Sequence, residues 1–217
     1  MRSLLLALFL LFSFPCFAEK VDVELVLIVD NSSSISSEEI IDQRESIRNA
    51  LRSPNVITTI QSNHHQKIAI SLIEFGEDTK ISIPWSIVKS RSDLVDFTNK
   101  FPDIEERLIG STYTGGAFRL AFQQIYFNEI ESTTQAIILI TDGKANDLNL
   151  LMDQIETFKS PSLVISALYI QDKTVSTGDL ISHITQFILF GYKKKLLEFN
   201  YVDIEKLLVH TLQFEVF

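Results

Sequence analysis

The sequence predicts a three-layer α/β domain: a doubly wound, mostly parallel six-stranded sheet with one antiparallel edge strand and helices on both faces. Apolar, β-branched segments alternate along the chain with amphipathic segments of about ten to fifteen residues. This alternation indicates parallel strands joined by right-handed helical crossovers. Apolar residues make up 46% of the chain, which is enough for a full core and argues against disorder.

Strands are expected where apolar runs are bounded by turn residues. The pattern predicts strands at Val23–Val29, Lys67–Phe75, Thr79–Trp85, Gln135–Ile140, Leu163–Ile170 and Lys195–Phe199. The first is apolar and partly β-branched, as a central strand is. The third alternates apolar and polar residues and contains Pro84, which a sheet tolerates near an edge. Because only the turn-like Gly76-Glu77-Asp78 separates the second and third strands, we expect these two to form an antiparallel hairpin.

Helices are expected where apolar residues recur with helical spacing. This spacing predicts a long first helix that runs on into 52–56, and further helices at 92–100, 114–129, 148–158, 179–190 and 202–214. Ser36 and Glu39, three residues apart, have the spacing of a capping box at the start of the first helix.

The first eighteen residues have the pattern of a secretory signal peptide. Arg2 precedes an almost unbroken apolar run at 4–14, and small residues lead to an expected cleavage site after Ala18. We therefore expect residues 1–18 to be removed, and residues 19–217 to form one exported domain in the periplasm or outside the cell. Cys16 is the only cysteine, so this domain would fold without disulfides or zinc thiolates. Lipid anchoring at Cys16 is disfavoured by Pro15 directly before it.

The charge balance limits the kinds of partner. A formal net charge of −9 makes nucleic acids and anionic lipid headgroups poor partners. Beyond residue 18, no apolar run reaches the length of about 18 residues that a membrane helix needs, so we expect no membrane insertion after cleavage. The sequence gives no indication of the oligomeric state.

Hydroxyl and carboxylate side chains gather where two predicted strands end. Asp30, Ser32 and Ser34 follow the first strand, and Asp142 follows the fourth. Because parallel strands end at one edge of the sheet, both carboxylates can face the same crevice. A third segment at 110–116 combines three glycines with hydroxyl side chains at the start of a helix. These oxygen donors favour a hard divalent cation over a soft metal.

Together these three segments resemble the von Willebrand factor type A domain with its metal-ion-dependent adhesion site. The resemblance rests on Asp-x-Ser-x-Ser at 30–34, Gly-Ser-Thr-x-Thr-Gly at 110–115 and Thr-Asp-Gly at 141–143. It covers essentially the whole chain after residue 18, which looks like a bacterial exported subgroup of that family with no assigned function. It implies that the hydroxyls of Ser32, Ser34 and Thr112 bind Mg²⁺ directly, with Mn²⁺ as a substitute, and that Asp30 and Asp142 hold it largely through water. Asn31 and Ser33 stand at variable positions that should not touch the metal.

The implied function is a non-enzymatic module that binds a protein partner. Hydroxyl ligands leave the cation incompletely neutralised, so a Glu or Asp carboxylate of the partner would complete its coordination. Two alternatives are a Mg²⁺-dependent phosphoryl-transfer enzyme with Asp30 as nucleophile, and a structural subunit of an envelope assembly. Thr114 is the alternative metal ligand to Thr112 and otherwise a cap of the following helix. Asp147 is interpreted as a solvated charge at a helix start.

Overall fold

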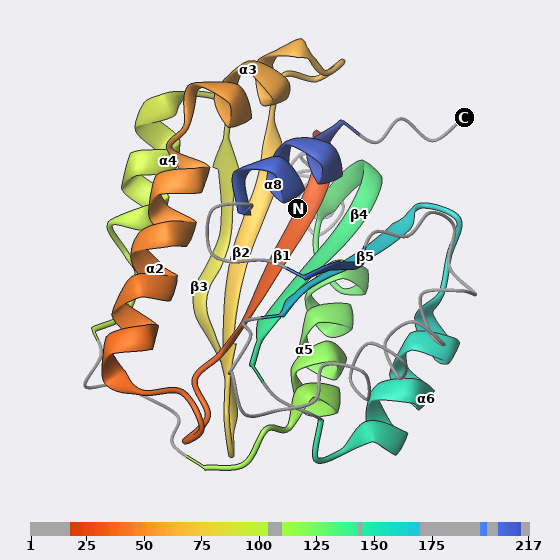
Figure 1. Cartoon of the computed structure of the whole chain (residues 1–217). Coiled ribbons are helices and arrows are strands. Elements are labelled where there is room, and N and C mark those ends of the chain that lie inside the picture. The colour runs from red at the N-terminus through yellow and green to blue at the C-terminus, as the bar shows by residue number, and fades with distance from the viewer. Residues whose placement is uncertain (1–17, 104–109, 143–144, 170–195, 199–203, 214–217) are drawn as a thin grey trace, which may run out of the picture.

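The computed structural model describes residues 18–103, 110–142, 145–169, 196–198 and 204–213. The strands are β1 (Glu19–Asp30), β2 (Ile68–Phe75), β3 (Thr79–Val88), β4 (Ile130–Thr141), β5 (Leu163–Tyr169) and β6 (Leu196–Glu198) (Figure 1). The helices are α2 (Ser37–Leu51), α3 (Pro54–Ser62), α4 (Arg91–Thr98), α5 (Thr114–Tyr126), α6 (Leu148–Phe158) and α8 (Ile204–Leu212).

The strands form one mixed sheet in the order β3-β2-β1-β4-β5-β6. β1 pairs in parallel with both β2 and β4, and β5 continues the parallel pairing beyond β4. Only β3 pairs antiparallel among the strands described, as the hairpin pattern predicted. Since the chain moves from β1 to β2 on one side and returns to β4 on the other, its connections diverge at β1 and β4. Open α/β sheets build their binding sites at such points.

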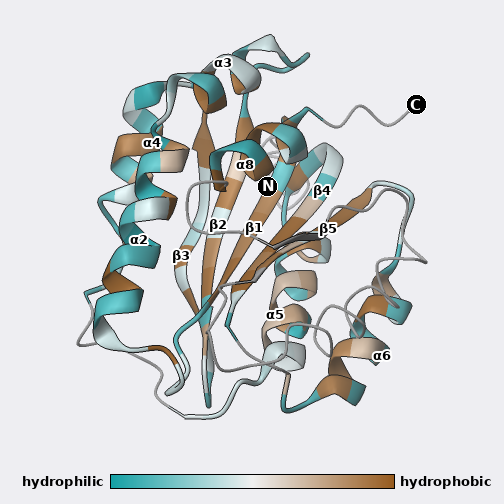
Figure 2. Cartoon of the chain, viewed as in Figure 1, coloured by the Kyte–Doolittle hydropathy of each residue, from teal (hydrophilic) through white to brown (hydrophobic). Residues whose placement is uncertain are grey.

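Helices cover both faces of this sheet. Side chains of a strand alternate between faces, so β1 contributes to two separate apolar clusters. Val23, Leu25, Leu27 and Val29 pack in a first cluster with residues of α2, α3, α4 and α8. Val26 and Ile28 pack in a second cluster with residues of α5 and α6. Figure 2 shows that the central strands are mainly hydrophobic and that α2 is largely hydrophilic.

The predicted α/β class and its single antiparallel strand are confirmed, but one helix was not predicted. The chain does not continue the first helix through Pro54. Instead α2 ends at Leu51, and Ser53 caps a separate helix, α3, by accepting from the Val56 N–H. Pro54 occupies the first turn of α3, where its missing N–H costs nothing.

Two parts of the prediction lie outside the described residues: the expected helix at 179–190 and almost all of the expected signal peptide. The count of six strands and the doubly wound layering therefore stay predictions, although a short β6 pairs with β5. No helix in the part of the chain that the structure describes combines the length and apolarity needed to cross a membrane.

Candidate metal centre

Asp30 and Asp142 lie side by side in the fold because their strands are neighbours. Asp30 is the last residue of β1, and Asp142 follows the last residue of β4. The two strands are in register up to the pair Val29 and Ile140, so they end together. Both carboxylates therefore stand at the point where the connections of the sheet diverge, at the lower edge of the sheet in Figure 1.

A continuous chain of hydrogen bonds joins four of the five predicted ligands. Asp30 Oδ1 accepts from the backbone N–H of Ser32 at 2.8 Å. The hydroxyls of Ser32 and Ser34 lie 3.0 Å apart, and the Ser34 hydroxyl donates to Asp142 Oδ1 at 3.1 Å. On the other side, Asp30 Oδ2 accepts from the Thr141 hydroxyl at 2.5 Å. The structure thus brings Asp30, Ser32, Ser34 and Asp142 into one cluster of oxygen donors.

Thr112, the fifth predicted ligand, reaches this cluster through its loop. The N–H and the hydroxyl of Ser33 both donate to the carbonyl of Gly110, at 3.1 and 3.0 Å. Thr112 itself is buried, with 8% of its surface exposed. Thr114, the alternative ligand, is buried as the first residue of α5. The two loops are therefore adjacent, while the choice between Thr112 and Thr114 stays a prediction.

The two carboxylates repel each other inside this cluster. Burial raises the pKa of Asp142 to about 6, and the negative charge of Asp30 contributes further to that increase. Burial also raises the pKa of Asp30, although hydrogen bonds from Thr141 and Ser32 oppose the shift. Two buried carboxyl groups that disfavour each other's charge are an arrangement that a divalent cation would stabilise.

A buried ion pair, which the sequence analysis did not identify, holds the loop after β1 through Asn31. Glu74 of β2 is 1% exposed and accepts from Arg44 Nη2 and Asn31 Nδ2, both at 2.8 Å. Its second oxygen accepts from the Ser82 hydroxyl at 2.5 Å. Because Asn31 lies between Asp30 and Ser32, this ion pair fixes the loop from the side opposite the cluster. Asn31 was expected only to avoid the metal, and it has this second role.

Asp147 stands at the start of α6, as expected, but it is more than a solvated charge. Asp147 Oδ1 and Oδ2 accept from the N–H groups of Gly115 and Gly116, at 2.8 and 2.9 Å. Asp147 therefore caps α5, whose own N-cap residue, Tyr113, makes no side-chain cap. Thr114, which was the predicted cap, is instead the first residue of the helix. The sequence did indicate that the cap of α5 comes from elsewhere, because Tyr113 before the helix has no short polar side chain and two glycines in the first turn allow another segment to approach.

The donor set fits a hard divalent cation. Two carboxylates and two hydroxyls stand in one hydrogen-bonded group, with a further hydroxyl on the adjacent loop. All are oxygen donors of the kind that Mg²⁺ and Mn²⁺ take, and no sulfur or imidazole is among them. No group of three or more His, Cys, Asp or Glu side chains with metal-binding spacing occurs within the described residues. A site here would depend on hydroxyls as well as carboxylates.

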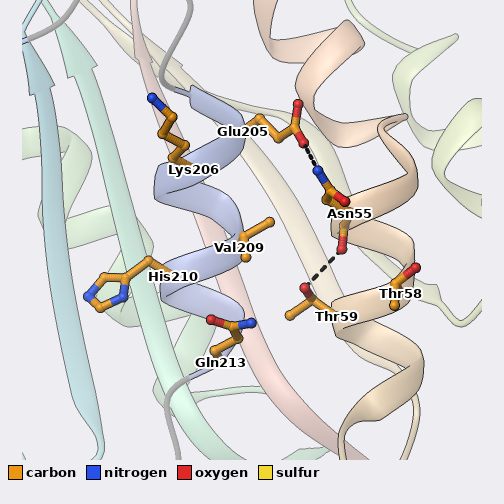
Figure 3. Close-up of a pocket in the computed structure, with 8 residues that line it drawn as sticks. All are labelled: Asn55, Thr58, Thr59, Glu205, Lys206, Val209, His210 and Gln213. Carbon is orange, nitrogen blue, oxygen red and sulfur yellow. Dashed lines mark hydrogen bonds between the residues drawn. The ribbon is translucent and has the colours of Figure 1, made fainter.

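A pocket lies between α3 and α8, away from the cluster at Asp30. It has a volume of about 440 Å³ and is lined mainly by polar side chains. Figure 3 shows that Lys206 and His210 project from α8 away from Asn55 and Thr59 of α3. A hydrogen bond of 2.7 Å from Asn55 to Glu205 ties the two helices together. Because these side chains do not point toward a common centre, this groove is a weaker candidate for a binding site than the cluster at Asp30.

Comparison with known proteins places the chain in a family and identifies its fold. A family model described as "Protein of unknown function (DUF1194)" matches residues 20–195. No curated protein matches the sequence significantly.

Among solved structures, the chain is similar to the open conformation of the pilus adhesin SpaC from Lactobacillus rhamnosus GG (TM-score 0.64, 16% identity, 89% of this chain and 30% of that one). It is also similar to an aerotolerance-related membrane protein from Bacteroides fragilis (0.58, 14%, 88% and 98%). A third similar structure is a von Willebrand factor type A protein from Catenulispora acidiphila (0.57, 14%, 89% and 42%). At these identities the similarity establishes a type A-like fold and nothing beyond it.

Proposed function

We propose a function for this chain, which belongs to the DUF1194 family of proteins of unknown function. It is an exported, non-enzymatic module that binds a protein partner through a divalent cation. Asp30, Ser32, Ser34, Thr112 and Asp142 would hold Mg²⁺, or Mn²⁺ in its place. The partner would supply a Glu or Asp carboxylate. The complete domain would be a doubly wound sheet of six strands that follows a signal peptide at residues 1–18.

The observation that carries this proposal is the hydrogen-bonded chain from Asp30 through Ser32 and Ser34 to Asp142. It joins residues 108 positions apart in sequence at the Ser34–Asp142 contact, where two central strands end. Short-range packing does not require four oxygen-bearing side chains at such a place, whereas a shared cation does. The raised pKa of Asp142 supports the same conclusion, because a bound cation would remove the cost of charging both carboxylates.

The proposed partner chemistry follows from the charge balance of the donor set. The direct ligands would be three neutral hydroxyls, with both carboxylates held off largely by water, so the first coordination shell would leave the charge of the cation incompletely neutralised. An anionic oxygen from outside is then attracted to the metal by its remaining charge. The similarity to a pilus adhesin agrees with a role in protein binding, which remains our proposal for this chain.

The phosphoryl-transfer alternative is disfavoured by the state of Asp30. The residue is fully buried, and each of its carboxylate oxygens accepts a hydrogen bond, from the Ser32 N–H and the Thr141 hydroxyl. A nucleophile needs an oxygen that the substrate can reach, and the complete burial of Asp30 keeps a phosphate group away from its carboxylate. In addition, Ser32 cannot act as the carboxylic acid–base partner that such chemistry uses at this position.

Calorimetric titration of the purified protein with Mg²⁺ tests the metal site. Ser32→Ala removes one hydroxyl ligand, so we expect its Mg²⁺ affinity to fall by about tenfold or more. The melting temperature in EDTA should stay close to that of the unaltered protein, because the fold does not depend on this hydroxyl. Ser33→Ala is the matched control, since Ser33 lies in the same loop and the variant keeps the hydrogen bond from its N–H to the Gly110 carbonyl. Its affinity should change by less than about twofold.

The proposal fails if the unaltered protein takes up no Mg²⁺ or Mn²⁺ at millimolar concentration. It also fails if Ser32→Ala and Ser33→Ala bind the metal equally well. A pull-down from envelope extract in Mg²⁺, repeated in EDTA and with Asp30→Ala, then addresses the partner. Proteins recovered equally under all three conditions would not be ligands of the metal.

A further inference from the structure

Asn146 holds the backbone of Thr112 at two points. Asn146 Oδ1 accepts from the Thr112 N–H at 2.6 Å, and the Asn146 N–H donates to the Thr112 carbonyl at 2.9 Å. This pair of bonds fixes the peptide groups on both sides of the Thr112 side chain. Because threonine is β-branched, few side-chain rotamers remain once its backbone is fixed. The position of the Thr112 hydroxyl is therefore determined largely by Asn146.

The next residue, Asp147, fixes the other end of the same loop. Its two carboxylate oxygens accept from Gly115 and Gly116, the second and third residues of α5. Asp147 stands at the N-cap position of α6, yet it makes no side-chain cap for that helix. A carboxylate at a helix N-terminus is favoured by the helix dipole, and here that benefit goes to α5. Both oxygens already accept hydrogen bonds, so Asp147 influences the metal centre through geometry.

The glycines of the loop allow this close approach. A Cβ atom on Gly115 would lie 2.5 Å from the Leu151 N and 2.9 Å from Asp147 Oδ2, both too close for real contacts. A Cβ atom on Gly116 would meet the Thr79 hydroxyl at 3.3 Å, which is tight but tolerable. Gly115 is thus required where the N-terminus of α6 presses against that of α5.

We propose that Asn146 and Asp147 are positioning residues of the metal centre: they hold the Thr112 hydroxyl in the place where it binds the cation. Between them they anchor the loop at residue 112 and at residues 115 and 116, on either side of Tyr113 and Thr114. They also join the Thr112 loop to the segment that carries Asp142, so that two of the three ligand segments move as one unit. This inference rests on the proposed function, because it assigns the pair a role only if Thr112 is a ligand.

A double-mutant cycle on the full-length protein tests this role. Mg²⁺ affinity is measured by calorimetry, and Mn²⁺ affinity by electron paramagnetic resonance, for Asp147→Ala, Thr112→Ala and the double variant. Asp153→Ala is the matched control, because it removes an exposed carboxylate from the same helix and changes the net charge equally. Asn146→Ala is a second variant, which removes the side-chain oxygen that accepts from the Thr112 N–H. Melting temperatures in EDTA report any loss of fold.

We expect Asp147→Ala to weaken metal binding by about tenfold, as removal of supporting residues around metal ligands commonly does. Asp153→Ala should change it by less than about twofold. In the Thr112→Ala background, Asp147→Ala should have no further effect, because the group through which it acts is absent. A general loss of stability or of negative charge would not vanish in that background.

The possible results are distinct. Absence of metal binding by the unaltered protein overturns the proposed function itself. Normal binding by the unaltered protein, with Asp147→Ala no weaker than Asp153→Ala, overturns only the positioning role. Additive losses in the double variant also overturn it, since they would mean that Asp147 acts independently of Thr112. Should Asp147→Ala not fold, Asn146→Ala decides by the same comparisons.

Discussion

In the absence of a cation, the negative charge of Asp142 is unfavourable in the folded protein. The Asp142 carboxylate accepts a hydrogen bond from Ser34 and lies close to the charge of Asp30. Its pKa rises from the usual 3.8 to about 6 on folding. The folded protein therefore retains the proton more strongly than the unfolded chain does. Charging Asp142 consequently disfavours the metal-free fold.

The sign of the resulting pH dependence follows directly. In EDTA, the contribution of Asp142 to the free energy of unfolding should be full below pH 4 and should decrease as the pH rises to about 6. With saturating Mg²⁺ the trend should reverse, because the cation binds the charged carboxylate and competes with the proton. Denaturant unfolding at several pH values, with and without Mg²⁺, measures both slopes.

Asp142→Asn isolates this contribution, since other buried carboxylates such as Glu24 and Asp30 also have raised pKa values. The difference between the unaltered protein and Asp142→Asn should change in EDTA between pH 4 and 6 and then level off. A constant difference across that range would contradict the assignment of the titration to Asp142.

At the scale of elements, the tip of β1 is tied to β2, β3 and α2 by the buried carboxylate of Glu74. Its partners are Arg44 of α2, Asn31 of the metal loop and Ser82 of β3, with Lys80 at 3.9 Å. Arg44 in turn donates to the carbonyl of Pro102 at 2.6 Å. A buried carboxylate with this many partners is satisfied, but the loss of its main cation leaves a charge in the core.

Arg44→Met should therefore destabilise the protein by about 3 kcal/mol or more, the usual cost of breaking a buried ion pair by removal of one partner. Equilibrium denaturation by urea measures the change in the free energy of unfolding. The matched control is Glu19→Gln, which breaks the exposed pair between Lys67 and Glu19. Exposed pairs contribute about 0–1 kcal/mol, so equal losses in the two variants would contradict the role given to Arg44.

The elements that local patterns specify are also those that the sequence predicted well. Helix α6 has the predicted bounds, and the capping box at Ser36 and Glu39 is present with both of its hydrogen bonds. Helix α3 was missed because 52–56 was interpreted as a continuation of the first helix, whereas Ser53-Pro54 begins another. A proline within an apolar segment signals both possibilities, and only the packing of Val56 and Ile60 in the core distinguishes them.

The site shows the same limit. The residues with donor atoms could be predicted, because their types and spacing reflect the chemistry of a cation. The residues that support them could not, because Glu74 and Asp147 act across 43 and 32 positions of sequence, on Asn31 and Gly115 respectively. In the sequence, Glu74 is one charged residue in a strand and Asp147 is one acidic residue at a helix start, and neither pattern indicates a supporting role. Their function depends on which segments the fold places next to each other.

At the scale of the whole molecule, β1 joins two cores into one cooperative unit. Its successive side chains enter opposite clusters, so neither cluster can lose its packing on β1 without disturbing the other. The only tryptophan, Trp85, packs against the second cluster and donates to the Gln124 carbonyl at 3.3 Å. Its fluorescence therefore reports the second cluster, whereas far-ultraviolet circular dichroism reports both.

Leu51→Ala in the first cluster and Phe122→Ala in the second should each destabilise the protein by about 2–5 kcal/mol, because both delete fully buried side chains. If the sheet couples the two faces, Leu51→Ala must shift the Trp85 fluorescence transition as far as the circular dichroism transition, although Leu51 belongs to the opposite cluster. Coincident urea transitions in both variants are the expected outcome. Were Leu51→Ala to shift the dichroism transition and leave the Trp85 transition in place, the two layers would unfold separately. A metal centre at the end of β1 would then rest on two independent halves, and the affinity losses predicted above would depend on which half each residue belongs to.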